Sequence, residues 1–124
     1  MNAMELAEKA VELKHGGYNC CQAVLTALSG ETEAPAQTLM QLGAGFGSGM
    51  GNMEATCGAL VGAVMAAGLK GGTIRSARQI SELFQAACGA VSCGDLKGKR
   101  TGIPICPCDD CVANAVAAYA EIMG

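Results

Sequence analysis

The stretch of sequence that decides the fold runs from Thr56 to Leu69 and reads Thr-Cys-Gly-Ala-Leu-Val-Gly-Ala-Val-Met-Ala-Ala-Gly-Leu. Its composition predicts a helix that is apolar on every side, and other parts of the chain must bury such a helix all round. Gly58 and Gly62 stand four residues apart and therefore share one face, where they would let another backbone approach closely. The two glycines at 71 and 72 end this segment.

The flanking sequence predicts further helices of ordinary length. Apolar residues recur at helical spacing most clearly over residues 74–88, where Thr73 is a suitable N-cap. Residues 94–107 are rich in glycine and proline and predict an excursion, and no segment alternates long enough to form a strand. We therefore expect a single all-α domain over residues 1–124, a compact bundle of five or six short helices. The remaining helices are expected at residues 3–14, 20–28, from Pro35 to about Leu42, and 111–123.

The composition excludes several classes of protein. Of 124 residues, 51% are hydrophobic and 15% charged, which argues against disorder. A net charge of −3 gives no nucleic-acid footprint, and the apolar run at 59–69 is too short to span a membrane. The N-terminus carries acids where a secretory signal needs bases, so we expect a cytoplasmic protein whose eight cysteines are reduced. Cysteines in that compartment favour metal binding or redox chemistry.

One loop is dominated by glycine. Five glycines alternate over residues 43–51, and four of them are expected to lie beside the cysteine site: Gly45, Gly47, Gly49 and Gly51. Such a run does not form a stable helix interior, and it predicts a loop whose backbone passes close to another part of the chain. It lacks the Gly-Lys-Ser/Thr of a P-loop, so nucleotide binding is not indicated.

Three of the eight cysteines form a CxCxxC cluster at Cys106, Cys108 and Cys111. Two sulfurs on one turn can reach the same metal ion, but the second paired knuckle of a zinc ribbon is missing. The single histidine, His15, fits the last turn of the first helix better than a ligand role. No hydrolytic triad or paired carboxylates are evident, so the sequence leaves enzymatic activity open.

Four cysteines share a second pattern, because each follows a residue type that favours the N-cap of a helix. These are Cys20 after Asn19, Cys57 after Thr56, Cys93 after Ser92 and Cys111 after Asp110. The pattern predicts four sulfurs in the first turns of helices, where free N–H groups and the macrodipole favour negative charge. On that basis we expect the pKa of these thiols to be lowered, so that thiolates are available as ligands or nucleophiles.

These motifs occur in a recognisable order: Tyr18-Asn-Cys20, the loop Gly45–Gly51, Cys57-Gly-Ala-Leu-Val-Gly62, Ser92-Cys93-Gly-Asp-Leu96 and Cys111. From about residue 16 to the end, the chain resembles the small redox-active proteins named after the pattern C_GCAxxG_C_C. The resemblance places the named pattern on Cys20, Cys57, Cys93 and Cys111. It departs at the second motif, where Thr56 precedes Cys57 and Gly58 follows it. The resemblance implies redox activity or metal binding, and a similar domain accompanies an iron–sulfur centre in split-Soret-type cytochromes.

The leading hypothesis is therefore an iron–sulfur electron-transfer protein that uses these four cysteines. Two alternatives stay open: a thiol–disulfide redox or sensor protein, and a structural zinc module. Cys21, Cys106 and Cys108 are possible accessory residues, whereas Cys88 on an apolar helix face favours a packing role. An electron-transfer protein is the expected partner, with no nucleic acid and no membrane, and a homodimer stays open.

Overall fold

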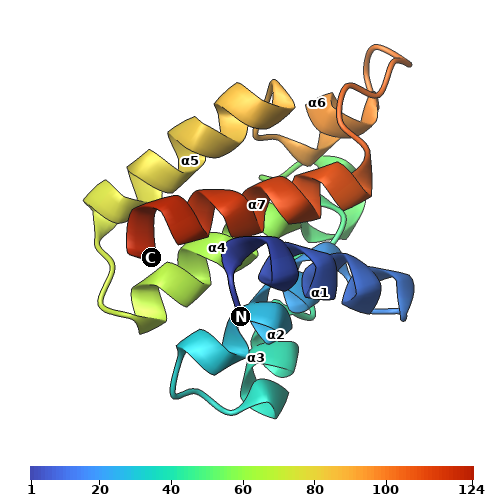
Figure 1. The fold of residues 1–124 in the computed structure, drawn as a ribbon. Coiled ribbons are helices and arrows are strands. Elements are labelled where there is room, and N and C mark those ends of the chain that lie inside the picture. Colours follow the sequence, from blue (N-terminus) through green and yellow to red (C-terminus); the bar gives the residue numbers. More distant parts are fainter.

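The computed structural model describes residues 1–124, apart from the side chain of Glu31, and it confirms the all-α class (Figure 1). Within this described part, β-pairing is limited to one isolated antiparallel bridge between Thr56 and Ser92. The α-helices are α1 (Ala3–His15), α2 (Cys20–Ala27), α3 (Ala36–Gly43), α4 (Gly58–Leu69), α5 (Ile74–Cys88), α6 (Cys93–Lys97) and α7 (Cys108–Met123). A 3-10 turn, η1 (Leu28–Glu31), follows α2, and a π-turn, η2 (Gly49–Met53), precedes α4.

Side-chain caps define the start of three helices. The side chains of Asn2, Asn19 and Thr73 each accept a hydrogen bond from a backbone N–H three residues on. The side chain of that third residue in turn accepts a hydrogen bond from the backbone N–H of the cap. These capping boxes satisfy N–H groups that a helix start leaves without a partner. The predicted cap at Thr73 and the predicted helix at 74–88 are thereby confirmed.

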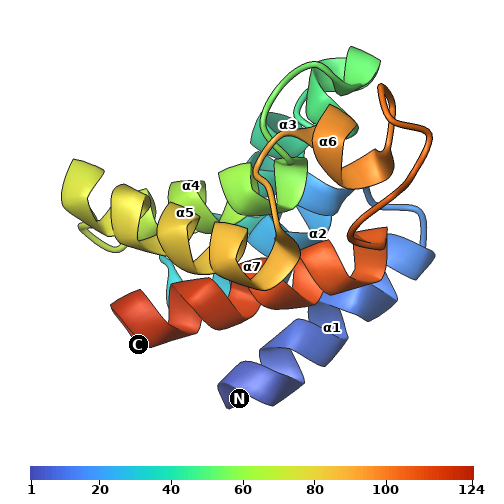
Figure 2. The ribbon, with the colours of Figure 1, turned by 90° about the horizontal axis from the view of Figure 1, so that it is seen from above.

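The core is built on α4 and α7. The apolar helix α4 packs against α2, α5 and α7, and α7 packs against α1, α4 and α5 (Figures 1 and 2). The close approach expected on one face of α4 is present, because a Cβ added at Gly62 would lie 2.9 Å from the carbonyl oxygen of Cys21. Phe84 and Tyr119 are the largest fully buried side chains, and the rest of the core is mostly Ala, Val, Leu and Cys.

The described residues form seven α-helices where five or six were predicted, and three elements differ from the prediction by more than one residue. The helix predicted at 56–69 begins at Gly58, because residues 55–57 extend along residues 91–93 instead. The predicted excursion at 94–107 contains most of α6, a helix of one turn and a half. The last helix begins at Cys108, three residues earlier than predicted, with Pro107 at its N-cap.

One end of the bundle gathers the short elements. In both views η2 and α6 lie beside each other, close to the N-terminal end of α7 (Figures 1 and 2). The same end receives the starts of α2 and α4, which carry Cys20 and Cys57. Over the described residues, the helices are all too short or too polar to cross a membrane.

Candidate cysteine site

Cys20 is positioned by the cap of its own helix. Asn19 accepts a hydrogen bond from the backbone N–H of Gln22 at 2.8 Å, which confirms Asn19 as the predicted N-cap of α2. The Asn19 Nδ2 donates to the carbonyl oxygens of Gly43 at 3.2 Å and Ala44 at 3.1 Å. One side chain therefore starts the helix that carries Cys20 and holds the glycine loop beside it.

Cys57 and Cys93 are brought together by backbone pairing. The N–H of Cys57 donates to the carbonyl of Val91 at 2.8 Å, and the N–H of Cys93 donates to the carbonyl of Ala55 at 2.9 Å. Cys57 is itself the N-cap residue of α4, so the prediction that Thr56 caps this helix is wrong.

The capping prediction holds in position only at Cys93, and it fails at Cys111. Ser92 occupies the N-cap position of α6, but its side chain makes no capping hydrogen bond. Asp110 lies inside the first turn of α7, because Pro107 is the N-cap. Local residue type could not reveal this, since the chain before each helix is directed by tertiary hydrogen bonds.

The glycine loop passes directly over the cysteines. A Cβ at Gly47 would lie 2.5 Å from the Asn19 side chain, and one at Gly49 would lie 2.7 Å from the Cβ of Cys93. The backbone of Ser48 hydrogen-bonds the thiol of Cys20. Ser48 and Gly49 both have left-handed backbone conformations, which cost free energy at a serine. Gly45 and Gly51 face open space, so their lack of a side chain has no such packing reason.

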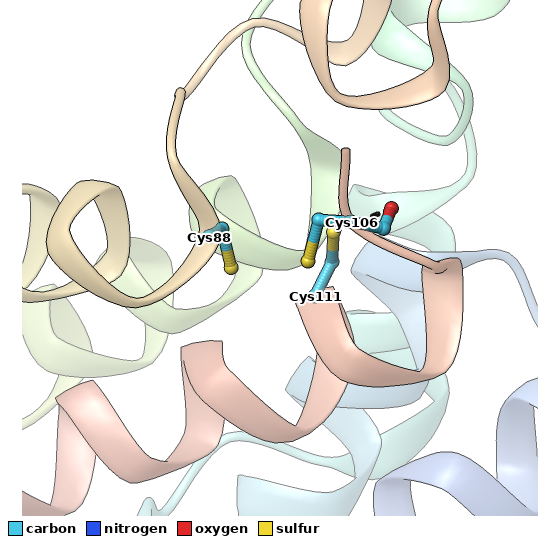
Figure 3. Close-up of side chains that lie close together, drawn as sticks. All are labelled: Cys88, Cys106 and Cys111. Atoms are coloured by element: carbon cyan, nitrogen blue, oxygen red, sulfur yellow. Dashed lines mark hydrogen bonds between the residues drawn. The ribbon is translucent and has the colours of Figure 1, made fainter. Parts of the chain in front are cut away.

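The thiols form a connected group across several helices. The Cys57 thiol interacts with those of Cys20 and Cys111, and the Cys106 thiol with those of Cys111 and Cys88, closely enough to change their pKa values. The Cys111 thiol also donates to the carbonyl oxygen of Cys106 at 3.7 Å. Within this group the sulfur atoms of Cys88, Cys106 and Cys111 all lie within 4.8 Å of one another. Figure 3 shows these three side chains pointing toward one another. Cys88 comes from the end of α5, Cys106 from the strap (residues 98–107, between α6 and α7) and Cys111 from the first turn of α7.

Burial and neighbouring thiols raise the pKa of several of these groups, contrary to the sequence prediction. A hydrogen bond from Cys57 and burial raise the pKa of Cys20 far above its ordinary value, and burial raises the pKa of Cys93. The hydrogen bond with Cys111 is the largest influence that raises the pKa of Cys57 to about 11. Neutral thiols are therefore favoured until a cation replaces their protons, as expected when several acids share one buried site.

The remaining cysteines take different places. Cys21 is fully buried behind Cys20, next to Gly43, and burial raises its pKa to about 12. Cys108 is partly exposed at the start of α7 and interacts electrostatically with Cys93. Cys88, for which the sequence favoured packing, is buried as expected but also adjoins Cys106 and Cys111. The spacing of Cys88 from the other cysteines does not predict that it joins this group, because the end of α5 meets the start of α7 only in the folded chain.

Lys97 is a residue of the site that the sequence analysis did not predict. Its Nζ donates to the carbonyl oxygen of Cys106 at 3.2 Å and lies 3.6 Å from the Sγ of Cys111. Burial lowers the pKa of Lys97, but nearby thiols, first among them Cys111, outweigh it and raise the pKa above its usual value. The ammonium therefore stays charged beside the sulfurs.

The donor set suits a soft metal or a metal–sulfur group. Thiolate ligands select such centres over hard cations, and three sulfurs within 4.8 Å can close on one ion. His15 lies away from the thiol group, exposed at the end of α1, where its Nε2 is hydrogen-bonded to the Oδ2 of Asp109 at 2.7 Å. Asn114 adds a polar neighbour, because its Nδ2 donates to the Sγ of Cys88 at 3.3 Å.

Comparison with known proteins gave one match. Searches of curated proteins and of solved structures each returned no match. A family model described as "Putative redox-active protein (C_GCAxxG_C_C)" matches residues 18–122, and this range contains all eight cysteines. The thiol group at the end of the bundle lies within the matched range. Because the match covers most of its length, the chain belongs to the C_GCAxxG_C_C family of redox-active proteins.

Proposed function

We propose that the cysteine site binds an iron–sulfur cluster and that the protein transfers electrons. The observation that carries this proposal is the run of interacting thiols from Cys20 through Cys57 to Cys111, which come from the starts of α2, α4 and α7. Iron–sulfur clusters are held by cysteine thiolates, and ligands of different irons are spread more widely than ligands of one ion. A group of sulfurs distributed over several elements fits that requirement.

Cys20, Cys57, Cys93 and Cys111 are the proposed ligands. Cys93 is the least connected of them, since it interacts with Cys20 electrostatically and is fixed by its backbone pairing with Ala55. All four are buried, and the glycine loop covers Cys20 and Cys93. The chain thus supplies thiolates in a place from which water is largely excluded. A bound cluster would supply a one-electron couple, and an electron-transfer protein is the proposed partner.

A second candidate is a single metal ion, such as zinc, held by Cys88, Cys106 and Cys111. Two thiolates bound to one tetrahedral zinc ion at about 2.3 Å lie roughly 3.8 Å apart. The observed limit of 4.8 Å between these sulfurs needs only a small closure to reach that spacing. This candidate rests on the compactness of the three, whereas the cluster proposal rests on the longer run of thiols.

The test is metal and sulfide analysis of protein purified without oxygen, together with its visible spectrum. Cys57→Ala is the informative variant. Cys21→Ala is the matched control, because Cys21 is equally buried but is not one of the four proposed ligands. We expect iron and acid-labile sulfide in the wild-type protein and in Cys21→Ala, and their loss in Cys57→Ala.

Three other results would overturn the cluster proposal. Stoichiometric zinc without sulfide would favour the single-ion candidate. A metal-free protein that reversibly loses two thiols with mild oxidant would indicate disulfide chemistry, in which two thiols release two electrons and two protons. A colourless protein with no iron and no thiol response would exclude both redox mechanisms.

A further inference from the structure

Lys97 places a positive charge against the sulfur group from outside the set of ligands. It is the last residue of α6, and its ammonium contacts both the Cys106 carbonyl at 3.2 Å and the Cys111 Sγ at 3.6 Å. Cys111 is the sulfur where the run from Cys20 and Cys57 meets the compact group with Cys88. The charge therefore lies next to the sulfur shared by both parts of the thiol group.

The backbone around Lys97 fixes its position. The N–H groups of Ile105 and Cys106 both donate to the carbonyl of Leu96, at 3.0 and 3.3 Å, so the strap before α7 is tied to α6. Gly98 then ends α6 with φ +74°, and a Cβ there would lie 2.5 Å from the backbone of Ile103. The backbone on both sides of the Lys97 side chain, at the end of α6 and in the strap, is therefore fixed by these contacts.

The two neighbouring basic residues, Lys99 and Arg100, make different contacts. Lys99 donates to the carbonyl of Asn52 at 2.7 Å and pairs with Glu54, and Arg100 pairs with Glu54 at 3.2 Å. Their charges are compensated by a carboxylate on the surface. The ammonium of Lys97 instead meets a carbonyl and a thiol, so its charge is available to interact with whatever charge develops on the sulfurs.

We propose that Lys97 is a positioning residue of the redox centre, which raises its reduction potential and strengthens metal binding by charge and by an N–H···S hydrogen bond to Cys111. This inference rests on the proposed function. Reduction adds a negative charge to the centre, and a fixed cation stabilises the reduced form more than the oxidised one. Hydrogen bonds to sulfur and local charge are recognised determinants of iron–sulfur potentials.

The same charge favours binding of a divalent ion. Three or four thiolates around a divalent ion carry a net negative charge. The Lys97 ammonium, 3.6 Å from the Cys111 Sγ, attracts that state. Removing its charge should therefore weaken metal binding near neutral pH.

The test compares Lys97→Gln with Lys97→Arg and Lys97→Met. Gln can still donate to the Cys106 carbonyl without carrying charge, Arg keeps the charge, and Met removes both. Arg100→Gln is the matched control, because Arg100 lies three residues away and pairs with Glu54 on the surface. Two quantities are measured: the midpoint potential of the reconstituted protein, in a mediated titration with dithionite as reductant, and the affinity of the metal-free protein for Co²⁺.

We expect Lys97→Gln and Lys97→Met to favour the oxidised form at least tenfold, a fall of about 59 mV for a one-electron couple, and to bind Co²⁺ at least tenfold more weakly. Lys97→Arg and Arg100→Gln should stay near wild type in both measurements. If Lys97→Met does not fold, Lys97→Gln carries the test, since it keeps the strap bond.

Equal potentials and Co²⁺ affinities in wild type and Lys97→Gln would overturn the inference. If the wild-type protein takes up no iron–sulfur cluster, the proposed function fails. The cobalt measurement then still decides whether Lys97 acts on the thiol group, so the two failures are distinguishable.

Discussion

Gly58 offers the sharpest test of how the backbone is fitted around the cysteines. A Cβ placed there would lie 2.5 Å from the carbonyl oxygen of Phe46 and 2.6 Å from the Sγ of Cys20, whereas ordinary van der Waals contact begins at 3.4 Å. The Phe46 oxygen is part of the backbone and cannot turn aside as a flexible side chain would. Gly58→Ala must therefore displace either the glycine loop or the Cys20 sulfur.

The expected cost follows from two opposing effects. Forcing an extra methyl group into a packed site costs about 1–3 kcal/mol. Alanine is favoured over glycine in a helix interior by up to about 1 kcal/mol, but Gly58 is the first residue of α4 and gains less than that. The clash outweighs the gain, so we expect Gly58→Ala to lower the free energy of unfolding by about 1–3 kcal/mol.

Gly68→Ala provides the control within the same helix. A Cβ there meets no atom within 4 Å, and the residue is exposed. This variant should be neutral or up to about 1 kcal/mol more stable. Urea denaturation of reduced, metal-free protein measures both, and a loss of about 2 kcal/mol lowers the midpoint by roughly 1–2 M. If Gly58→Ala is as stable as Gly68→Ala, the close packing inferred at the site is refuted.

Three further predictions concern the thiols and one surface cluster. In absorbance titrations Cys111→Ala should weaken Co²⁺ binding at least tenfold more than Cys21→Ala does, because Cys111 belongs to the group of three close sulfurs and Cys21 does not; equal losses would contradict this. The pKa values of Cys57 and Cys21 are raised to about 11 and about 12, so the folded state keeps protons that the unfolded state releases. The stabilisation that these two thiols contribute to the reduced, metal-free protein is then fully present below about pH 9. It is lost as the pH rises through 11 and 12, by about 1.4 kcal/mol per pH unit for each group. A free energy of unfolding that stays constant over that pH range would contradict this prediction. Lys99 lowers the pKa of Glu54, so the stability from this exposed pair is present at neutral pH and lost as the pH falls through the lowered value, and Glu54→Gln should remove that acid-dependent part in thermal melts.

Local sequence signals succeeded where the controlling contacts are short-range. The helix at 74–88 was predicted with its observed bounds, because its apolar stripe and the Thr73 cap lie within the segment itself. Asn19 was likewise identified as a cap, since its hydrogen bond to Gln22 is local. The same rule misplaced the starts of the last helix and of the helix that follows Cys57, where distant backbone pairs and Pro107 decide the boundary.

The site could be predicted in its residue types but not in its arrangement. The expectation of lowered thiol pKa values assumed isolated sulfurs at helix starts. In the folded chain Cys20 and Cys57 are buried against each other, and this raises the pKa of both. Cys88 and Lys97 belong to the site because they lie close to Cys106 and Cys111 in the folded chain. No local sequence pattern predicts those contacts.

The sequence by itself determined an all-α chain, a fully apolar central helix and a reservoir of eight cysteines, because hydrophobic periodicity and composition act over one or two helical turns. Tertiary structure alone decided which sulfurs meet, how protonated they are and which cation approaches them. Those properties depend on burial and on distances between elements that are far apart in the chain, and both arise only when the helices pack.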